Sequence, residues 1–167
     1  GDQNRMVTAF TNVMKAHAGM AKAIRDNDTT SARGNGRKAA ETGLAHHMRF
    51  FESASWGTLD NFISGVTDSY FNDTVLIANT DGVVRVNLPP VIQVEVPIEH
   101  LKGSFDFIGL NYYGRDFVRA DLTDASLSKQ FVPKDRPKNA LGWDIYPEGL
   151  ERLLVPKAKS CRSTRPV

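Results

Sequence analysis

The sequence predicts an α/β fold with parallel strands, from three observations. The apolar stretch Phe105–Leu110 is typical of a strand that is covered on both faces, as in parallel sheets. A second stretch of strand length and apolar character, residues 42–51, comes earlier in the chain, and an amphipathic helix lies between the two. Strand, helix and strand in this order form a βαβ unit, whose crossover is expected to be right-handed.

The bulk composition predicts one soluble globular domain. The chain has 167 residues, 41% of them hydrophobic and 24% charged. No apolar run approaches the roughly 20 residues that span a bilayer, and the N-terminal residues do not have the pattern of a secretory signal, so a cytoplasmic location is expected. Cys161 is the only cysteine, which excludes an internal disulfide and a multi-cysteine zinc site. No metal and no cofactor are predicted.

The first predicted element is an amphipathic helix over residues 4–25. Apolar residues and one histidine recur there at steps of three and four: Met6, Phe10, Val13, Met14, His17, Ala21 and Ile24. Residues 26–41 are polar and contain Gly34 and Gly36, which predicts a loop. A phosphate-binding role is not expected of this loop, because no strand precedes it and the full phosphate-loop spacing is missing.

The strand predicted over residues 42–51 contains His46 and His47. Adjacent residues of a strand point to opposite faces, so the two imidazoles are not expected to share a metal ion. One packed histidine beside a site-facing or solvent-facing one is the better interpretation.

A second helix is predicted to follow, with Thr58 or Asp60 as its N-cap. Its apolar stripe, typical of a core-facing helix, contains Leu59, Phe62, Ile63, Val66, Tyr70 and Phe71. Asp81-Gly82 then lies between VLIANT and VVRVNL, and local rules predict a β-hairpin there.

Polar side chains begin at the end of the stretch Phe105–Leu110. Period-two alternation places Asn111 and Tyr113 on one side of the strand and Tyr112 on the other. In barrels built from βα units, side chains at the C-terminal ends of strands face the active site. Asn111 and Tyr113 are therefore either a polar pair at the rim of a pocket or side chains that satisfy backbone groups of the next loop.

Two motifs bear a family resemblance. FDFIGLNYY (105–113), followed by GWDIYPEGLERLL (142–154), closely resembles glycoside hydrolase family 1, the β-glucosidase and β-galactosidase family. The resemblance implies that residues 1–154 form part of a (β/α)8 TIM barrel, from the helix after strand 4 through the helix after strand 6. It also implies that Gly82 lies just past a helix end and not in a hairpin turn.

The resemblance implies a retaining glycosidase, which uses one carboxyl group as acid/base and a second as nucleophile. The family carries these in Asn-Glu-Pro after the fourth strand and Glu-Asn-Gly after the seventh, and neither motif occurs here. No catalytic residue is therefore predicted. The remaining candidates for a replacement pair are Asp106, Asp116, Asp144 and Glu148.

The resemblance implies three substrate-binding residues. Tyr113 matches the family tyrosine that hydrogen-bonds the nucleophile, and Asn111 matches a pocket residue near the sugar subsite. Trp143 matches the platform on which the aglycone packs, with a core anchor for the next helix as the alternative. Asp144 stands where the family commonly has glutamate.

Two functions remain open. The first is a β-glucosidase-type hydrolase of β-glycosides or oligosaccharides, of which this chain supplies a cleft wall while the catalytic acids come from elsewhere. The second is a non-catalytic partial barrel that binds sugar or serves as a structural piece. Unpaired strand edges then predict self-association, or pairing with a chain that carries the missing barrel strands.

The last residues, 155–167, carry Lys157, Lys159, Arg162 and Arg165 and no acidic residue. Since the whole chain has a formal charge of +2, the preceding part is slightly acidic. A basic tail can bind the phosphates of nucleic acid. Scattered charges without aromatic partners favour a solvated, disordered tail instead.

Overall fold

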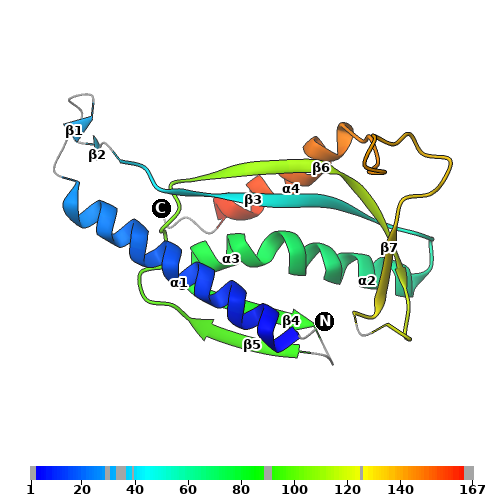
Figure 1. Cartoon of the computed structure of the whole chain (residues 1–167), viewed down its shortest axis with the longest axis horizontal. Coiled ribbons are helices and arrows are strands. Elements are labelled where there is room, and N and C mark those ends of the chain that lie inside the picture. Colours follow the sequence, from blue (N-terminus) through cyan, green and yellow to red (C-terminus); the bar gives the residue numbers. More distant parts are fainter. Residues whose placement is uncertain are drawn as a thin grey trace. The chain divides into compact units, whose positions relative to one another are not determined.

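The computed structural model describes residues 3–28, 31–32, 37–38, 40–88, 92–124 and 126–163 (Figure 1). Its elements are, in order, α1 (Gln3–Asn27), β1 (Ser31–Ala32), β2 (Arg37–Lys38), β3 (Gly43–Ser53), α2 (Thr58–Asp68), the π-helix η1 (Ser69–Asp73), α3 (Thr74–Asp81), β4 (Val83–Leu88), β5 (Ile92–Pro97), β6 (Phe107–Ala120), β7 (Ser128–Phe131) and α4 (Glu148–Ser163).

The chain divides into two compact units. Unit one contains Gly1–His46, Thr74–Asn87 and Ile92–Leu110, and unit two contains His47–Asp73, Leu88–Val91 and Asn111–Val167. The long strands β3 and β6 begin in unit one and end in unit two.

The predicted parallel strands are β3 and β6, which run side by side in the same direction (Figure 1). In unit one Asp106 N donates to Thr42 O at 2.7 Å, and in unit two Ala54 N donates to Val118 O at 2.8 Å. In both bonds the two residues are 64 positions apart in the sequence (106 − 42 and 118 − 54), as a parallel register requires. β7 pairs antiparallel with β6, from Phe117↔Phe131 to Ala120↔Ser128. Among the described residues the strands form no closed barrel.

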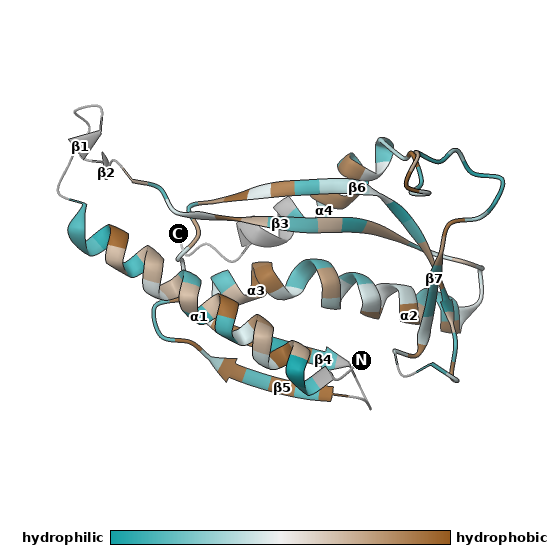
Figure 2. Cartoon of the chain, in the orientation of Figure 1, coloured by the Kyte–Doolittle hydropathy of each residue, from teal (hydrophilic) through white to brown (hydrophobic). Residues whose placement is uncertain are grey.

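β6 is longer than the sequence predicts. Figure 2 shows hydrophobic residues at its start and hydrophilic ones along its middle, as the change at Asn111 predicts. The strand nevertheless continues to Ala120, because β7 supplies hydrogen-bond partners for its last residues. Asn111 and Tyr113 therefore lie within the strand and not at its end.

α1 confirms the predicted first helix, but its buried face differs from the predicted stripe. Met14, His17 and Ala21 are buried, as expected. Met6, Val13 and Ile24 belong to the predicted stripe but are exposed. The buried face also includes three residues outside that stripe: Val7, Thr11 and Ala18.

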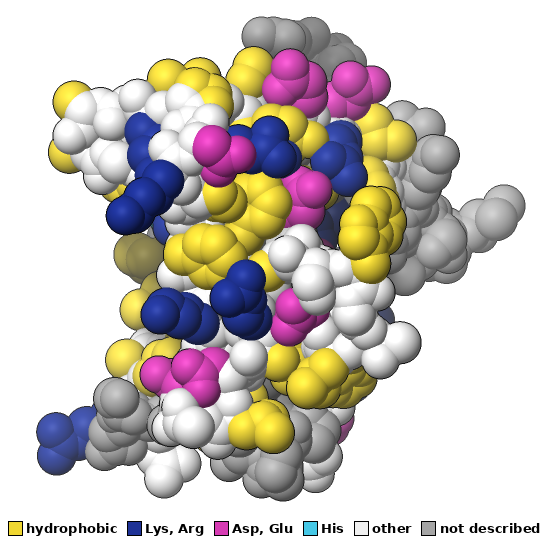
Figure 3. Space-filling view, turned by 90° about the vertical axis from the view of Figure 1, so that its right-hand side faces the viewer, with side chains coloured by type: hydrophobic (Ala, Val, Ile, Leu, Met, Phe, Trp, Pro, Cys, Tyr) yellow, Lys and Arg dark blue, Asp and Glu magenta, His cyan; other side chains and the backbone are white. Residues whose placement is uncertain are grey.

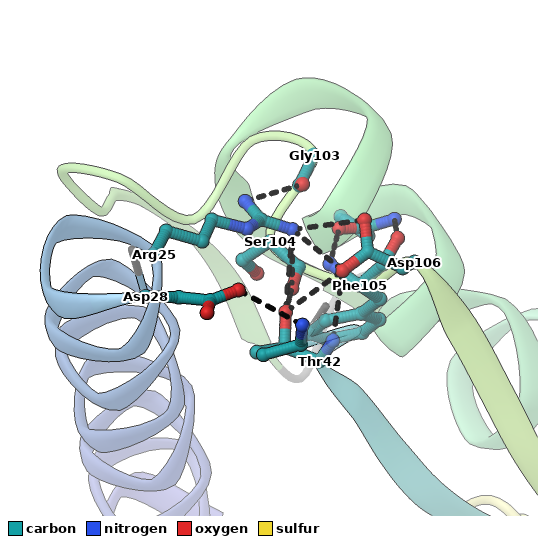
Figure 4. A network of polar contacts seen from close by, with 9 residues as sticks. Arg25, Asp28, Thr42, Gly103, Ser104, Phe105 and Asp106 are labelled. Atoms are coloured by element: carbon teal, nitrogen blue, oxygen red, sulfur yellow. Dashed lines mark hydrogen bonds and ion pairs between the residues drawn. The ribbon is translucent and has the colours of Figure 1, made fainter. Parts of the chain in front are cut away.

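Hydrogen bonds join the end of α1 to the starts of β3 and β6 within unit one (Figure 4). Arg25 donates to Gly103 O at 3.0 Å and to both carboxylate oxygens of Asp106 at 3.1 Å. Thr42 N donates to Asp106 Oδ2 at 2.8 Å. Burial alone would raise the pKa of Asp106, but the bonds from Thr42 and Arg25 outweigh it and lower that pKa. Asp106 is thus a fixed structural anion.

The predicted caps of α2 are wrong. Gly57 is its N-cap, and no side chain caps the helix. Asp60 instead accepts hydrogen bonds from Ser55 Oγ at 2.6 Å and from Ala120 N at 2.8 Å, which ties the first turn of the helix to β6. The predicted stripe buries Ile63, which packs with Phe51 and Val118 in the core of unit two. Leu59 and Phe62 of the same stripe are exposed.

The hairpin predicted at Asp81-Gly82 is wrong, and the position implied by the family resemblance is right. VLIANT lies in α3, and Gly82 N donates to Ala78 O at 2.9 Å. Gly82 has φ 75°, the left-handed conformation that ends many helices. β4 pairs instead with β5.

Two further predictions change in part. The predicted loop 26–41 contains the short antiparallel pair β1–β2, and the remainder of its glycine-rich segment, residues 33–36, lies outside the described residues. The predicted boundary after residue 154 falls inside α4, so residues 155–163 of the expected disordered tail are helical. Residues 164–167 of that tail are outside the described part.

No helix in the described part of the chain is both long and apolar enough to cross a membrane.

Candidate carbohydrate-binding site

Asn111 and Tyr113 are exposed on β6, and Tyr112 is partly buried between them in sequence, as the alternation predicts. The Tyr113 side chain packs against Trp143, with ring centroids 5.1 Å apart and planes at 55°. The structure therefore brings two of the three predicted site residues into contact. Tyr112 donates its hydroxyl hydrogen to Tyr146 O at 2.7 Å, and burial raises the pKa of Tyr112 to about 12.

The loop before Trp143 is held by Asn139. The Asn139 Oδ1 atom accepts hydrogen bonds from Leu141 N at 2.9 Å and from Trp143 N at 3.0 Å. Asn139 N also donates to Trp143 O at 3.0 Å, and Gly142 turns the chain with φ 79°. The indole of Trp143 thus projects from a fixed backbone, which is what an aromatic platform requires.

Gly114, the residue after Tyr113, allows the loop to approach β6. A Cβ on Gly114 would lie 2.4 Å from Asp144 O, and its φ of 153° is one that other residues rarely adopt. A strand glycine of this kind marks a close backbone approach. Gly114 therefore sets the distance at which Trp143 and Asp144 meet the strand.

Arg115 and Asp144 form a buried ion pair beneath this loop. Arg115 Nε donates to Asp144 Oδ2 at 2.7 Å, and Arg115 Nη1 donates to Glu52 Oε2 at 2.7 Å. The Arg115 guanidinium also lies 3.8 Å from the centroid of the Tyr146 ring. Burial by itself lowers the pKa of Arg115, but its two carboxylate partners outweigh this and raise the pKa, so the charge is permanent.

A second, partly buried ion pair joins β3 and β6. Arg49 Nη1 of β3 is 2.9 Å from Asp116 Oδ2 of β6, without the alignment of a hydrogen bond. Burial raises the pKa of Asp116, Arg49 opposes this, and the negative charge of Asp144 adds to it. Asp144 Oδ1 is itself buried and has no hydrogen-bond partner among the described residues.

The candidate replacement carboxylates do not form a catalytic pair. Asp106 is bound by Arg25 and Thr42, Asp116 by Arg49, and Asp144 by Arg115. Glu148 is exposed in the first turn of α4. In retaining glycosidases the two carboxyl groups face each other about 5 Å apart across the sugar. These side chains instead serve as partners of arginines or lie at a helix end.

The sequence predicts one packed histidine at positions 46 and 47, beside a site-facing or solvent-facing one. In the structure His47 packs against aromatic rings. Its ring meets the Tyr113 ring edge-on, with centroids 4.8 Å apart. No three His, Cys, Asp or Glu side chains in the described part of the chain gather as metal ligands would.

The arginines of the two ion pairs were not identified from the sequence. The sequence gives no clear signal for Arg115, because the predicted strand ends at Leu110 and only the structure extends β6 over Arg115 and Asp116. Charged side chains are rarely buried unless they are paired. Arg115 pairs with Asp144 and Asp116 pairs with Arg49. Because these partners are distant in sequence, the pairing is visible only in the folded chain.

The chain matches known β-glycosidases in sequence and structure, although no family model matches it. It is 31% identical over 158 residues to β-glucosidase A of Thermotoga maritima, covering 87% of this chain and 32% of that protein. It is 24% identical over 170 residues to a β-galactosidase of Pyrococcus woesei, covering 88% of this chain and 32% of that protein.

Solved structures give the same result for the fold. A family 1 β-glucosidase from Thermotoga maritima superposes with a TM-score of 0.72 at 24% identity, covering 89% of this chain and 33% of that one. A β-glucosidase from Exiguobacterium marinum superposes with a TM-score of 0.74 at 19% identity, covering 95% and 36%. The chain spans about a third of the length of these relatives. In sequence and in fold it therefore matches a segment of the glycoside hydrolase family 1 β-glucosidases.

Proposed function

We propose that this chain supplies a wall of a β-glycoside-binding cleft, with Trp143 as the platform and Asn111 and Tyr113 as the polar side. The observation that supports this most is the contact of Tyr113 with Trp143 on the exposed side of β6. Aromatic rings present flat apolar surfaces on which the apolar face of a sugar packs, and polar groups beside them orient its hydroxyls.

The relatives support a glycoside as the ligand. One structure of the Thermotoga maritima enzyme is described as a complex with a cyclophellitol analogue that mimics the transition state, and another as a complex with isofagomine lactam. In both structures the enzyme is about three times as long as the matched segment. For this chain, glycoside binding is a proposal that draws on these relatives and on the aromatic pair.

We also propose that the chain does not hydrolyse glycosides by itself. Retaining hydrolysis needs two facing carboxyl groups, and both family motifs that carry them are missing from the sequence. Three of the candidate replacements are bound to other side chains. Loss of both groups removes most of the rate enhancement that slow glycoside hydrolysis requires.

Binding is tested by titration of cellobiose into the protein, followed by isothermal calorimetry or ligand-observed NMR. Trp143→Ala is expected to weaken binding at least about tenfold, because the loss of one stacked ring costs more than ~1.4 kcal/mol. Trp56→Ala is the matched control, since Trp56 is fully exposed and is not one of the proposed binding residues, and it should bind as the unmodified chain does. Equal effects of the two substitutions would contradict the proposed platform.

Catalysis is tested with 4-nitrophenyl β-D-glucoside and with a 2-deoxy-2-fluoro glucoside that traps a glycosyl-enzyme. Turnover is expected to equal that of heat-inactivated protein, and mass spectrometry should find no covalent adduct. An adduct on any carboxylate of this chain would refute the claim that the chain lacks its own nucleophile.

A second role, as a structural piece that associates, has its own support. Leu59 and Phe62, three residues apart on α2, are 49% and 64% exposed, and Trp56, just before the helix, is fully exposed. Figure 3 shows hydrophobic side chains exposed among basic and acidic ones on one face. Large apolar side chains exposed along one short segment are typical of interaction surfaces.

Light scattering tests this second role. The unmodified chain is expected to form dimers or larger species, and Trp56→Ser with Phe62→Ser is expected to lower its mass. Leu122→Ser, which removes another exposed apolar side chain of unit two, is the control and should leave the mass unchanged. A well-folded monomer at all concentrations would contradict the proposed association.

A further inference from the structure

A continuous series of ring contacts joins the core of unit two to the proposed platform. Phe51, a member of the core cluster, contacts Phe71 edge-on at 5.5 Å, and Phe71 contacts His47 edge-on at 5.4 Å. His47 contacts Tyr113 edge-on at 4.8 Å, and Tyr113 contacts Trp143 at 5.1 Å. Edge-to-face contacts fix ring orientation as well as distance. The orientation of Tyr113 therefore depends on His47, the ring directly behind it.

His47 is the polar member of this series of rings, and its position lowers the stability of the fold. Its Nε2 atom is buried and has no hydrogen-bond partner among the described residues. A buried polar atom without a partner lowers stability relative to an apolar ring of the same shape. Phenylalanine would make the same edge contacts without that cost, so the imidazole at this position is a candidate for a role that depends on titration.

The charged groups around His47 disfavour a proton on its ring. Arg49, two residues along β3, is the charge that acts on it directly, and Arg49 is paired with Asp116 of β6. From η1 the contact is Phe71, which carries no charge, and Asp73 of the same element is bound by Lys157 at 2.5 Å. Burial first and Arg49 second lower the pKa of His47 below its ordinary value. Both effects favour the neutral form of the ring over the protonated form.

We propose that His47 is a positioning residue for the platform: its neutral ring holds Tyr113 against Trp143, and uptake of a proton by the ring releases this pair. The proposal rests on the proposed function, because it assigns a pH dependence to the same carbohydrate platform. The proton comes from solvent, and the imidazolium needs a hydrogen-bond acceptor at Nε2, which no described residue supplies in this arrangement. Protonation therefore requires His47 to move, and Tyr113 loses its support.

The experiment uses the full chain with Trp56→Phe, which leaves Trp143 as its only tryptophan. Emission of Trp143 is followed from pH 8 to pH 5, with and without cellobiose, and far-UV circular dichroism of the same samples checks that the fold persists. Cellobiose affinity is expected to fall at least about threefold between pH 7.5 and pH 5, in the range where histidine titrates. Without sugar, the emission of Trp143 is expected to shift with the same midpoint.

Two further variants in the Trp56→Phe background identify the group. His47→Phe keeps an edge-on ring without a titratable atom, so it should bind cellobiose within about twofold of the parent at pH 7.5, with no pH dependence down to pH 5. His46→Phe, at the neighbouring position of β3, is the matched control and should keep the full pH dependence of its parent.

The outcomes separate this proposal from the proposed function. If His47→Phe keeps the emission shift of its parent, or if the parent shows no shift, the proposal about His47 is refuted. If cellobiose does not bind at any pH but the emission shift is present and disappears in His47→Phe, the positioning by His47 is supported and the proposed function is refuted. If binding is present and independent of pH, the platform stands and His47 does not control it.

Discussion

Arg115 Nε and Asp144 Oδ2 meet at 2.7 Å in a part of unit two where the Asp144 side chain is completely buried. The pair joins β6 to the loop that carries Trp143, the residue before Asp144. Because Gly114 and Tyr113 immediately precede Arg115, one short stretch of β6 contacts both the ion pair and the platform. The geometry of the proposed site therefore depends on a buried ion pair that does not itself contact the sugar.

Asp144→Asn is expected to destabilise the chain by about 3–5 kcal/mol, because it leaves the buried charge of Arg115 without its closest partner. Urea unfolding measures the change. Asp26→Asn is the matched control, since its partner Lys22 is also exposed and such pairs contribute less than about 1 kcal/mol. If both substitutions have the same small effect, the pair is not buried in solution.

Gly114→Ala is expected to destabilise the chain by more than about 1 kcal/mol, since a methyl group there would overlap Asp144 O and φ is unfavourable for alanine. Thermal unfolding gives the difference. Gly65→Ala, within α2 and with open space around its Cβ position, should raise stability by up to about 1 kcal/mol. A neutral Gly114→Ala would show that the Trp143 loop does not approach β6 as closely as described.

Stability is expected to decrease as the pH falls below about 6.5, the ordinary pKa of histidine. Burial lowers the pKa of both His17 and His47, so the unfolded chain binds more protons in this range. Their contribution is fully present above the unfolded pKa and is lost as the pH falls through the folded values. Urea midpoints at pH 7.5 and 5.5 measure the slope.

His17 offers a way to verify the source of that slope. Its ring packs edge-on against Phe105 at 4.4 Å, and its buried Nε2 has no hydrogen-bond partner in the described part of the chain. His17→Leu should reduce the loss of stability between pH 7.5 and 5.5, because leucine does not titrate. An unchanged slope would assign the effect to other groups.

Asp106→Asn is expected to cost about 1–3 kcal/mol at pH 7, because the carboxylate accepts hydrogen bonds from Thr42 N and from Arg25. The pKa of Asp106 is lowered in the fold, so its contribution is present above the unfolded value near 3.8 and is lost as the pH falls through the folded value. The difference between the variant and the unmodified chain should therefore shrink in acid. Chemical unfolding at pH 7 and pH 3 compares them, and a constant difference would exclude a role of the charge.

Much of the fold follows from local patterns. The period of apolar residues predicts α1, the apolar runs predict β3 and β6, and the motifs around Tyr113 and Trp143 predict the family segment that the relatives confirm. These features depend on residues close together in the chain, where sequence periodicity reflects geometry directly.

Other features depend on contacts between distant residues. The pairing of β6 with β7 extends the strand to Ala120, and Asp60, a predicted cap of α2, binds Ala120 N instead. Likewise, the buried face of α1 includes Val7 but not Val13, although either residue fits an amphipathic helix. Local patterns leave such choices open.

The amino-acid sequence by itself determined the class of fold and the position of the two parallel strands. Tertiary structure alone decided that Arg115 meets Asp144, that the candidate carboxylates are held by arginines, and that His47 stands behind Tyr113. The physical reason is that burial and pairing of charges depend on which surfaces pack together, and packing brings together residues that no short stretch of sequence contains.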